Sequence, residues 1–354
     1  MKHLIALLVP LLTLAACGGG GDAPATAGHG SIQTKVSAVQ LTVASPQTPS
    51  SSQIGPALET PVSQLDAALG CSPDLDQATR PPILLVPGIF LNPDNQYSWN
   101  WVLELQRLHI PHCVVRLPNE GTADLQVSAE YLVHAIRQMA TRSKHKVQIV
   151  GSSVGGMLPR WVLRFWPDTR NLVEDLVSLA GAHHGALLAD GICLPGCQPA
   201  VFQAKPNSNF LRVLNSGFET LPDVAYTSVY TRTDIVLFPS IGPNASAILK
   251  GGSANVVNIA TQDICPLNVA ENLLAGTSDP VVYAVAMDAI QHPGKADARR
   301  ISRSVCGQIG MPAVDPGSVP LRFAATTAFF SAQLALQPKV AQEPPLRCYA
   351  SGSC

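Results

Sequence analysis

Short runs of β-branched and other apolar residues alternate along this chain with segments whose apolar residues recur at helical spacing. The apolar runs predict strands at residues 83–86, 113–116, 147–150, 176–179, 224–230 and 255–260. Between the second and third runs, Tyr131, Ala135 and Met139 fall on one face of a predicted helix. This alternation favours an α/β fold, a mostly parallel sheet with helices on both faces. In such sheets, chemistry gathers at the carboxyl ends of the strands.

One predicted strand ends in a Gly-x-Ser-x-Gly motif, which spans Gly151 to Gly155 and leads into a predicted helix over 157–166. A serine on such a strand-to-helix turn is exposed. When it attacks a carbonyl, backbone N–H groups at the start of the helix face the oxyanion that forms. The flanking glycines leave room for the turn. Ser153 is therefore the candidate nucleophile, and the Val154 N–H is a candidate oxyanion donor.

Two other strand ends supply candidate partners for this serine. Gly88 follows the strand at 83–86 and permits the close turn of a second oxyanion donor, although it also suits an ordinary strand-end turn. Asp234 follows the strand at 224–230 and comes after the nucleophile in chain order, as the acid of a hydrolase triad does. Aspartate is also a common turn former, so both interpretations stay open.

The N-terminal residues predict export. Residues 1–17 have a basic start and an apolar run too short to span a membrane, as in a signal peptide. Leu14–Cys17 resembles a bacterial lipobox, which implies lipidation of Cys17 and membrane contact through it; an ordinary cleaved signal is the alternative. Residues 18–60 are rich in small and polar residues and predict a flexible linker. Residues 61–354 are then expected to form one folded domain.

Charge and cysteine content indicate which partners and cofactors to expect. The chain has 23 Lys plus Arg against 24 Asp plus Glu, so no nucleic-acid partner is implied. The chain has nine cysteines, and eight remain when Cys17 is set aside. An even number of cysteines in an exported chain favours disulfides. Cys193 and Cys197 are expected to form a local disulfide rather than half of a metal site, because no second pair matches them. Neither a metal nor an organic cofactor is expected.

Several motifs occur together in a recognisable order: Ile83–Gly88, Ser128–Tyr131, Leu158–Trp161, Arg164–Pro167, Tyr230–Asp234, Cys265, Ser278–Pro280, His292–Gly294 and Cys306. The chain resembles the lipase B-type α/β-hydrolases over nearly its whole length after about Leu65. The resemblance implies an α/β-hydrolase fold with a possible small lid. It implies hydrolysis of acyl esters or lipids through an acyl-Ser153 intermediate, with Asp234 as the acid.

The resemblance also assigns the oxyanion hole and the disulfides. The oxyanion donors would be the N–H groups of Ile89 and Val154. Ile89 stands where the family's prototype has a threonine, so a side-chain donor is lost. The implied disulfides are Cys71–Cys113, Cys265–Cys306 and Cys348–Cys354.

The most consequential departure from the family is the missing histidine. Counting from Cys265 and from Ser278 places Asn272 at the family's catalytic histidine, and an amide has no usable basicity. His292 keeps the chain order of a triad but lies well beyond the expected position. His183 and His184 follow the strand after the elbow helix and suit structural hydrogen bonding.

Three interpretations therefore stay open. The chain is an exported serine ester hydrolase with another base or a slow rate, a silent relative that binds lipid or protein at the cell surface, or a lipase with an introduced asparagine. Residues 191–215 are expected to form either a lid or pocket wall, or a packed core helix. We expect a monomer, secreted or attached to a bacterial cell envelope.

Overall fold

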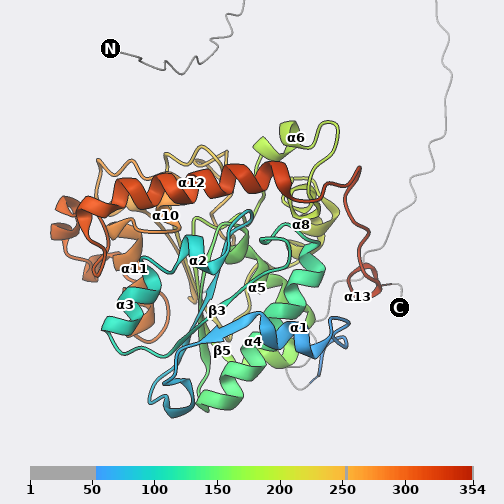
Figure 1. The fold of residues 1–354 in the computed structure, drawn as a ribbon, viewed down its shortest axis with the longest axis horizontal. Coiled ribbons are helices and arrows are strands. Elements are labelled where there is room, and N and C mark those ends of the chain that lie inside the picture. The colour runs from blue at the N-terminus through green and yellow to red at the C-terminus, as the bar shows by residue number, and fades with distance from the viewer. Residues whose placement is uncertain (1–52, 252–253, 353–354) are drawn as a thin grey trace, which may run out of the picture. The chain divides into compact units, whose positions relative to one another are not determined.

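Seven strands of the part of the chain that the structure describes form one sheet, which lies among the helices in Figure 1. The order of the strands in the sheet is β1-β3-β2-β4-β5-β6-β7. The computed structural model describes residues 53–251 and 254–352. The strands are β1 (Leu69–Cys71), β2 (Ile83–Val86), β3 (His112–Val115), β4 (Val147–Ser152), β5 (Val173–Leu179), β6 (Ala225–Tyr230) and β7 (Val256–Ala260). Strands β2 to β7 pair in parallel and β1 is antiparallel to β3. The predicted α/β sheet is confirmed, whereas the short edge strand β1 was not predicted.

Helices cover both faces of the sheet because successive residues of a buried strand point to opposite sides. In β2, Leu84 and Val86 belong to the apolar cluster that contains α4 and α5, whereas Ile83 and Leu85 belong to the cluster of α3 and α11. The α-helices are α1 (Val62–Ala67), α2 (Pro93–Gln96), α3 (Trp101–Arg107), α4 (Leu125–Ser143), α5 (Val154–Phe165), α6 (Leu188–Ile192), α7 (Pro199–Gln203), α8 (Asn209–Leu214), α9 (Thr261–Ile264), α10 (Asn272–Ala275), α11 (Pro280–Gln291), α12 (Val319–Leu336) and α13 (Cys348–Ser351).

The path of the chain places a site between β2 and β4. The chain runs from β2 to β3 on one side and then crosses to β4 on the other side of β2. In open parallel sheets, the crevice beyond the carboxyl ends of strands at such a reversal is the usual ligand site. The turns after β2 and β4 carry Gly88 and Ser153, so the fold brings these two sequence motifs to the same edge.

One stretch of the described residues, Asn272–Gln291, is apolar and long enough to cross a membrane. It contains α10 and α11, and 78% of its apolar 18-residue window is buried inside the protein. Its apolar character is explained by packing against the sheet, where Val282 and Val285 belong to the cluster on one face.

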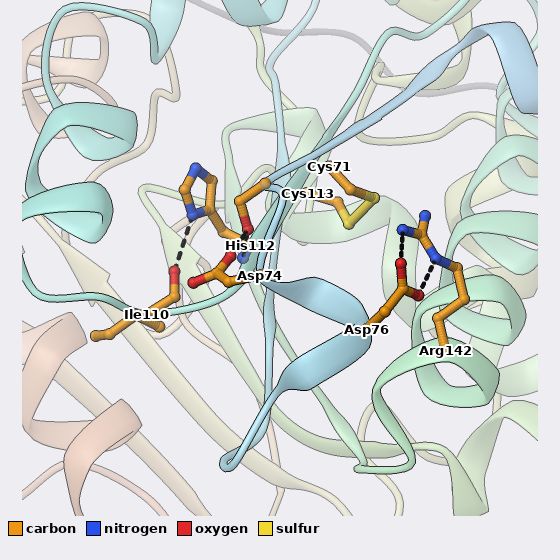
Figure 2. The surroundings of a disulfide bond; sticks show 8 residues. Cys71, Asp74, Asp76, Ile110, His112, Cys113 and Arg142 are labelled. Atoms are coloured by element: carbon orange, nitrogen blue, oxygen red, sulfur yellow. Dashed lines mark hydrogen bonds and ion pairs between the residues drawn. A yellow bond between two sulfur atoms is a disulfide. The ribbon is translucent and has the colours of Figure 1, made fainter.

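A disulfide attaches the edge strand β1 to β3 (Figure 2). Cys71 and Cys113 are direct partners in the antiparallel register. Beside them, His112 Nδ1 lies 2.9 Å from the Ile110 carbonyl, and Arg142 of α4 binds both carboxylate oxygens of Asp76. Burial lowers the pKa of His112, so this histidine is neutral and structural.

Two of the three other expected disulfides are seen, and the third falls partly outside the described residues. Cys193–Cys197 and Cys265–Cys306 are both formed. Cys348 is disulfide-bonded, and its expected partner Cys354 lies outside the described residues, as does the proposed lipidation site Cys17.

The expected boundary between linker and domain falls at residue 60. The signal at 1–17 and most of the linker lie outside the described residues. The last residues of that expected linker already contact the domain: the Trp166 indole N–H donates to Pro56 O, and the Glu59 and Thr60 N–H groups donate to Glu130. The hydrogen bonds to the domain thus begin before residue 61.

A buried carboxyl in β5 predicts a pH-dependent stability. Asp175 is 2% exposed and accepts a hydrogen bond from Gln148, and burial raises its pKa to about 7. The folded state therefore holds this proton more tightly than the unfolded chain, whose aspartate has a pKa of about 4. The favourable contribution of this protonated carboxyl to the free energy of unfolding is complete below pH 4 and is lost as the pH rises to about 7.

We expect Asp175→Asn to remove this loss. The difference in the free energy of unfolding between the variant and the wild type should therefore increase by about 2–4 kcal/mol, in favour of the variant, when the pH is raised from 5 to 8. Urea unfolding at the two pH values measures this. Glu174→Gln on the same strand is the matched control and should leave the pH dependence of the wild type. Equal pH dependence in Asp175→Asn and Glu174→Gln would refute the assignment of the pH-dependent stability to Asp175.

Candidate active site

Ser153 lies on the turn between β4 and α5 and has a strained backbone. Its φ is 54° and its ψ is −123°, a conformation that residues other than glycine rarely adopt and that persists only where the surroundings enforce it. The Ser153 N–H donates to Leu179 O at 3.0 Å, and its carbonyl accepts from the Ala182 N–H at 3.1 Å. Its side chain is partly exposed and lines a cavity. The predicted elbow therefore has the expected geometry.

The glycines of the motif allow the turns after β2 and β4 to touch. A Cβ on Gly155 would lie 2.3 Å from Pro87 O, and one on Gly151 would lie 2.1 Å from Gly155 O. A Cβ on Gly88 would lie 3.3 Å from the Ser153 Cβ. Gly88 is thus in direct contact with the elbow, which puts the Ile89 turn beside the serine.

A buried glutamine fixes this turn. The Gly88 N–H donates to Gln96 Oε1 at 2.9 Å, and Gln96 Nε2 donates to Gly276 O at 3.2 Å. Among the described residues, neither the Ile89 N–H nor the Val154 N–H donates to a backbone carbonyl. Val154 is the first residue of α5, where N–H groups have no partner within the helix. Both predicted donors are therefore available to a ligand at this edge of the sheet.

Asp234 lies on the loop after β6 and is 5% exposed. Its Oδ1 accepts from the Val236 and Leu237 N–H groups at 2.9 and 2.8 Å. Burial raises the pKa of Asp234, and the hydrogen bonds from Leu237, Asn272 and Val236 oppose this shift. The carboxyl group is thus held in one orientation, with Oδ2 directed to the segment that carries residue 272.

Asn272 is the first residue of α10 and occupies the place from which a histidine would face the acid. Its Nδ2 donates to Asp234 Oδ2 at 3.0 Å and lies 3.4 Å from Ala180 O. Glu271 caps the helix by accepting from the Leu273 and Leu274 N–H groups. An imidazole Nδ1–H could make the same bond to Asp234 and present its second nitrogen as a base, which an amide cannot do.

An apolar cavity of about 440 Å³ opens above the serine. Ser153 and Asn272 both line it, and Glu271 is the one ionisable residue among its lining residues. The apolar lining comes from the oxyanion turn, the α6–α7 region, the loop after Asp234, and α12: Ile89, Phe90, Leu91, Val154, Ala182, Ala186, Leu188, Ala189, Ile192, Val201, Ala204, Ile235, Val236, Leu237, Leu273, Phe323, Phe330 and Leu334.

No histidine of the described ranges 53–251 and 254–352 lines this cavity. His292 follows α11, is bonded to the Asp288 carbonyl and lines a different cavity. His183 is fully buried and has its pKa lowered by burial, and His184 is bonded to Glu219. Neither ring nitrogen of His183 has a hydrogen-bond partner in the described part of the chain, so the structural hydrogen bonding expected for it is not seen, whereas His184 makes such a bond. The structure brings none of the three side chains to Ser153.

The expected lid segment divides into two parts. Ile192, Val201 and Ala204 line the cavity, whereas Phe210 and Leu214 of α8 are buried in the main apolar core. The first part is thus a pocket wall and the second a packed core helix, so each of the two alternatives holds for one half.

Sequence patterns missed the contribution of α12. In Figure 1 this helix runs across the end of the molecule where α2, α6 and α10 lie. Phe323, Phe330 and Leu334 on α12 line the cavity. The only signal in the sequence was a long apolar segment with a single charged residue, Arg322, and its position over the serine depends on the tertiary fold.

Comparisons with known proteins agree with this architecture. A family model described as Lipase (class 2) matches residues 128–262. The chain is 29% identical over 301 residues to Lipase B of Pseudozyma antarctica, which covers 83% of this chain and 86% of that protein. It superposes on the crystal structure of Aspergillus fumigatus lipase B with a TM-score of 0.77 and 26% identity, covering 85% of this chain and 74% of the other.

Proposed function

We propose that this chain, which is lipase B-like in sequence and fold, hydrolyses carboxylic esters through an acyl intermediate on Ser153. The observation that carries the proposal is the position of the serine. It stands on a strained elbow and on the wall of an apolar cavity, beside two backbone N–H groups that have no backbone acceptor within the described ranges. Relatives named as lipases support the same reaction class.

The proposed reaction has two steps. The Ser153 Oγ adds to the ester carbonyl and loses its proton, and the Ile89 and Val154 N–H groups stabilise the oxyanion. The alcohol then leaves with a proton, and water attacks the acyl-serine to release the acid and regenerate the hydroxyl. Each step needs a group that takes and returns a proton. Ile89 contributes only its backbone, so the oxyanion hole has no side-chain donor.

Asn272 makes this reaction slow. Its amide keeps the bond to Asp234, but it cannot accept the serine proton. Removal of the base from a serine triad costs about six orders of magnitude in turnover, and the oxyanion hole and substrate binding retain a residual rate. We therefore propose slow turnover, with water as the proton acceptor.

The cavity favours neutral esters with apolar acyl groups. Its walls are mostly aliphatic and aromatic, and these bury an acyl chain favourably. Glu271 would repel an anionic group placed beside it. The proposed substrates are therefore acyl esters or lipids rather than charged metabolites.

The hydrogen bond between Asn272 and Asp234 favours a second candidate function. It satisfies the buried acid with an amide and leaves Ser153 without a basic partner. A chain in this state would bind an acyl ester or lipid, or a protein partner, at the cell surface without turning it over.

The location of the protein forms part of the proposal. Disulfides such as Cys71–Cys113 fit an exported protein, because they persist in oxidising compartments. We propose export as a monomer, either secreted or held at a bacterial envelope by lipidation of Cys17.

Ester hydrolysis by the purified protein and by Ser153→Ala tests the proposal. We expect the wild type to hydrolyse p-nitrophenyl butyrate slowly and to carry a butyryl group on Ser153, seen by mass spectrometry of the intact protein. Ser153→Ala cannot form this adduct and keeps only the residual rate that the oxyanion hole and substrate binding supply. Equal rates, together with saturable binding of an acyl ester by both proteins, would support the binding function instead.

A further inference from the structure

The residue after the proposed oxyanion donor Ile89 has an unfavourable backbone conformation. Phe90 has a φ of 63°, which lies in the left-handed region that bulky residues rarely adopt. Such a conformation persists only where neighbouring contacts enforce it. If Phe90 relaxed to an ordinary conformation, the adjoining backbone would rotate with it. The φ of Phe90 orients the peptide that joins it to Ile89. Whatever holds Phe90 therefore also constrains the backbone of Ile89, whose N–H is the proposed oxyanion donor.

The Phe90 ring is held in an apolar cluster and is 2% exposed. The disulfide Cys193–Cys197 and Val201 supply part of this cluster. Phe330 of α12 packs edge-on against Phe90, with ring centroids 5.1 Å apart and an interplanar angle of 75°. On the main-chain side, a Cβ on Gly121 would lie 3.3 Å from Ile89 Cα. The turn is thus supported by close packing at its backbone and by Phe330 at its side chain.

Helix α12 is attached to the domain at few points. Of its 18 residues, Val319 and Thr326 are the buried ones. Its polar attachments include Thr326 Oγ1 to Asn95 O at 3.0 Å and Gln198 Nε2 to Leu334 O at 2.9 Å. Phe330 thus links a peripheral helix directly to the oxyanion turn.

We propose that Phe330 is a positioning residue for the oxyanion hole. Its ring holds Phe90 in the left-handed conformation and thereby directs the Ile89 N–H toward the position where the oxyanion forms. This inference rests on the proposed function, because it gives Phe330 a part in ester hydrolysis at Ser153. It differs from a role as pocket wall, in which Phe330 would only contact long acyl chains.

The test uses Phe330→Ala in the full chain that also carries Asn272→His, so that turnover is fast enough to measure. With p-nitrophenyl acetate, whose acyl group is too short to need a long apolar wall, we expect kcat to fall about tenfold or more with little change in KM. Loss of a whole oxyanion donor costs about 10²–10³ in kcat, and Phe330→Leu should recover part of the loss. An unchanged kcat on acetate, with a raised KM on long-chain esters, would overturn the proposal.

A double-mutant cycle with Phe90→Gly gives a second test. Glycine adopts a positive φ freely, so this variant removes the strain together with the anchor. We expect Phe90→Gly and the Phe90→Gly/Phe330→Ala pair to lose kcat to the same extent as Phe330→Ala, since both ends of one contact are removed. Independent, multiplicative losses would contradict the coupling.

The neighbouring residue on α12 provides the matched control. Phe329 does not line the cavity, and Phe329→Ala should keep the kcat of its parent. Thermal unfolding of each variant shows whether the domain stays folded. If Asn272→His alone is inactive, the proposed function fails. If it is active and Phe330→Ala matches it on acetate, only the positioning role fails.

Discussion

Replacing Asn272 with histidine should raise kcat/KM for p-nitrophenyl butyrate by at least about three orders of magnitude, equivalent to about 4 kcal/mol of transition-state stabilisation. The amide of Asn272 already donates to Asp234 Oδ2 at 3.0 Å. An imidazole in the same place would donate to that oxygen and offer its second nitrogen to Ser153. The proposed nucleophile, oxyanion donors and acid all lie at this edge of the sheet, so in the proposed reaction the base is the missing group.

Asn272→Gln is the control for this gain. Glutamine extends an amide further toward the serine but remains without basicity, so its rate should stay at the level of the wild type. A folded Asn272→His variant without any gain would show that the base position has been assigned to the wrong residue. A gain in both variants would point to a change in cavity shape rather than to proton transfer.

The second large effect concerns Asp234, and it depends on residue 272. In the Asn272→His background, Asp234→Asn should lower kcat by about 10³–10⁴, because the acid orients the histidine and stabilises its charged form. In the wild type the same change should alter the rate by less than about threefold, since no histidine is present to be oriented. Steady-state kinetics on the four proteins measures both effects.

Asp263→Asn controls for loss of a carboxylate near the same strands, because Asp263 pairs with Arg232 at the surface. It should leave the rate of either background unchanged. Equal losses from Asp234→Asn in both backgrounds would mean that Asp234 maintains the fold of the loop rather than acting through a base.

The parts of the site that the sequence predicted are those with strong local patterns. The strand before Gly88 and the one before Ser153 are fully buried apolar runs that end in glycine-containing turns, so their ends could be located from the chain alone. Asp234 was predicted by the same reasoning, because it follows the buried strand β6. The position of Asn272 opposite the acid came from the family resemblance and agrees with its hydrogen bond to Asp234.

The parts that could not be predicted depend on contacts between distant segments. The short strand β1 has no fully buried residue, so it lacks the apolar run that marks the other strands. Helix α12 is apolar nearly all round, and its periodicity does not show which side covers the cavity. The left-handed backbone of Phe90 is enforced by packing that includes Phe330, which is 240 positions further along the sequence. Such a conformation leaves no signal at the position itself.

The rate at which a fluorophosphonate attaches to Ser153, followed by mass spectrometry of the intact protein, tests the central claim most directly. The reagent requires an activated hydroxyl and needs no deacylation step, so it reports the serine and its base alone. We expect rapid single-site labelling of Asn272→His, labelling of the wild type slower by about three orders of magnitude, and none of Ser153→Ala. Equal labelling rates in the wild type and Asn272→His would contradict the account.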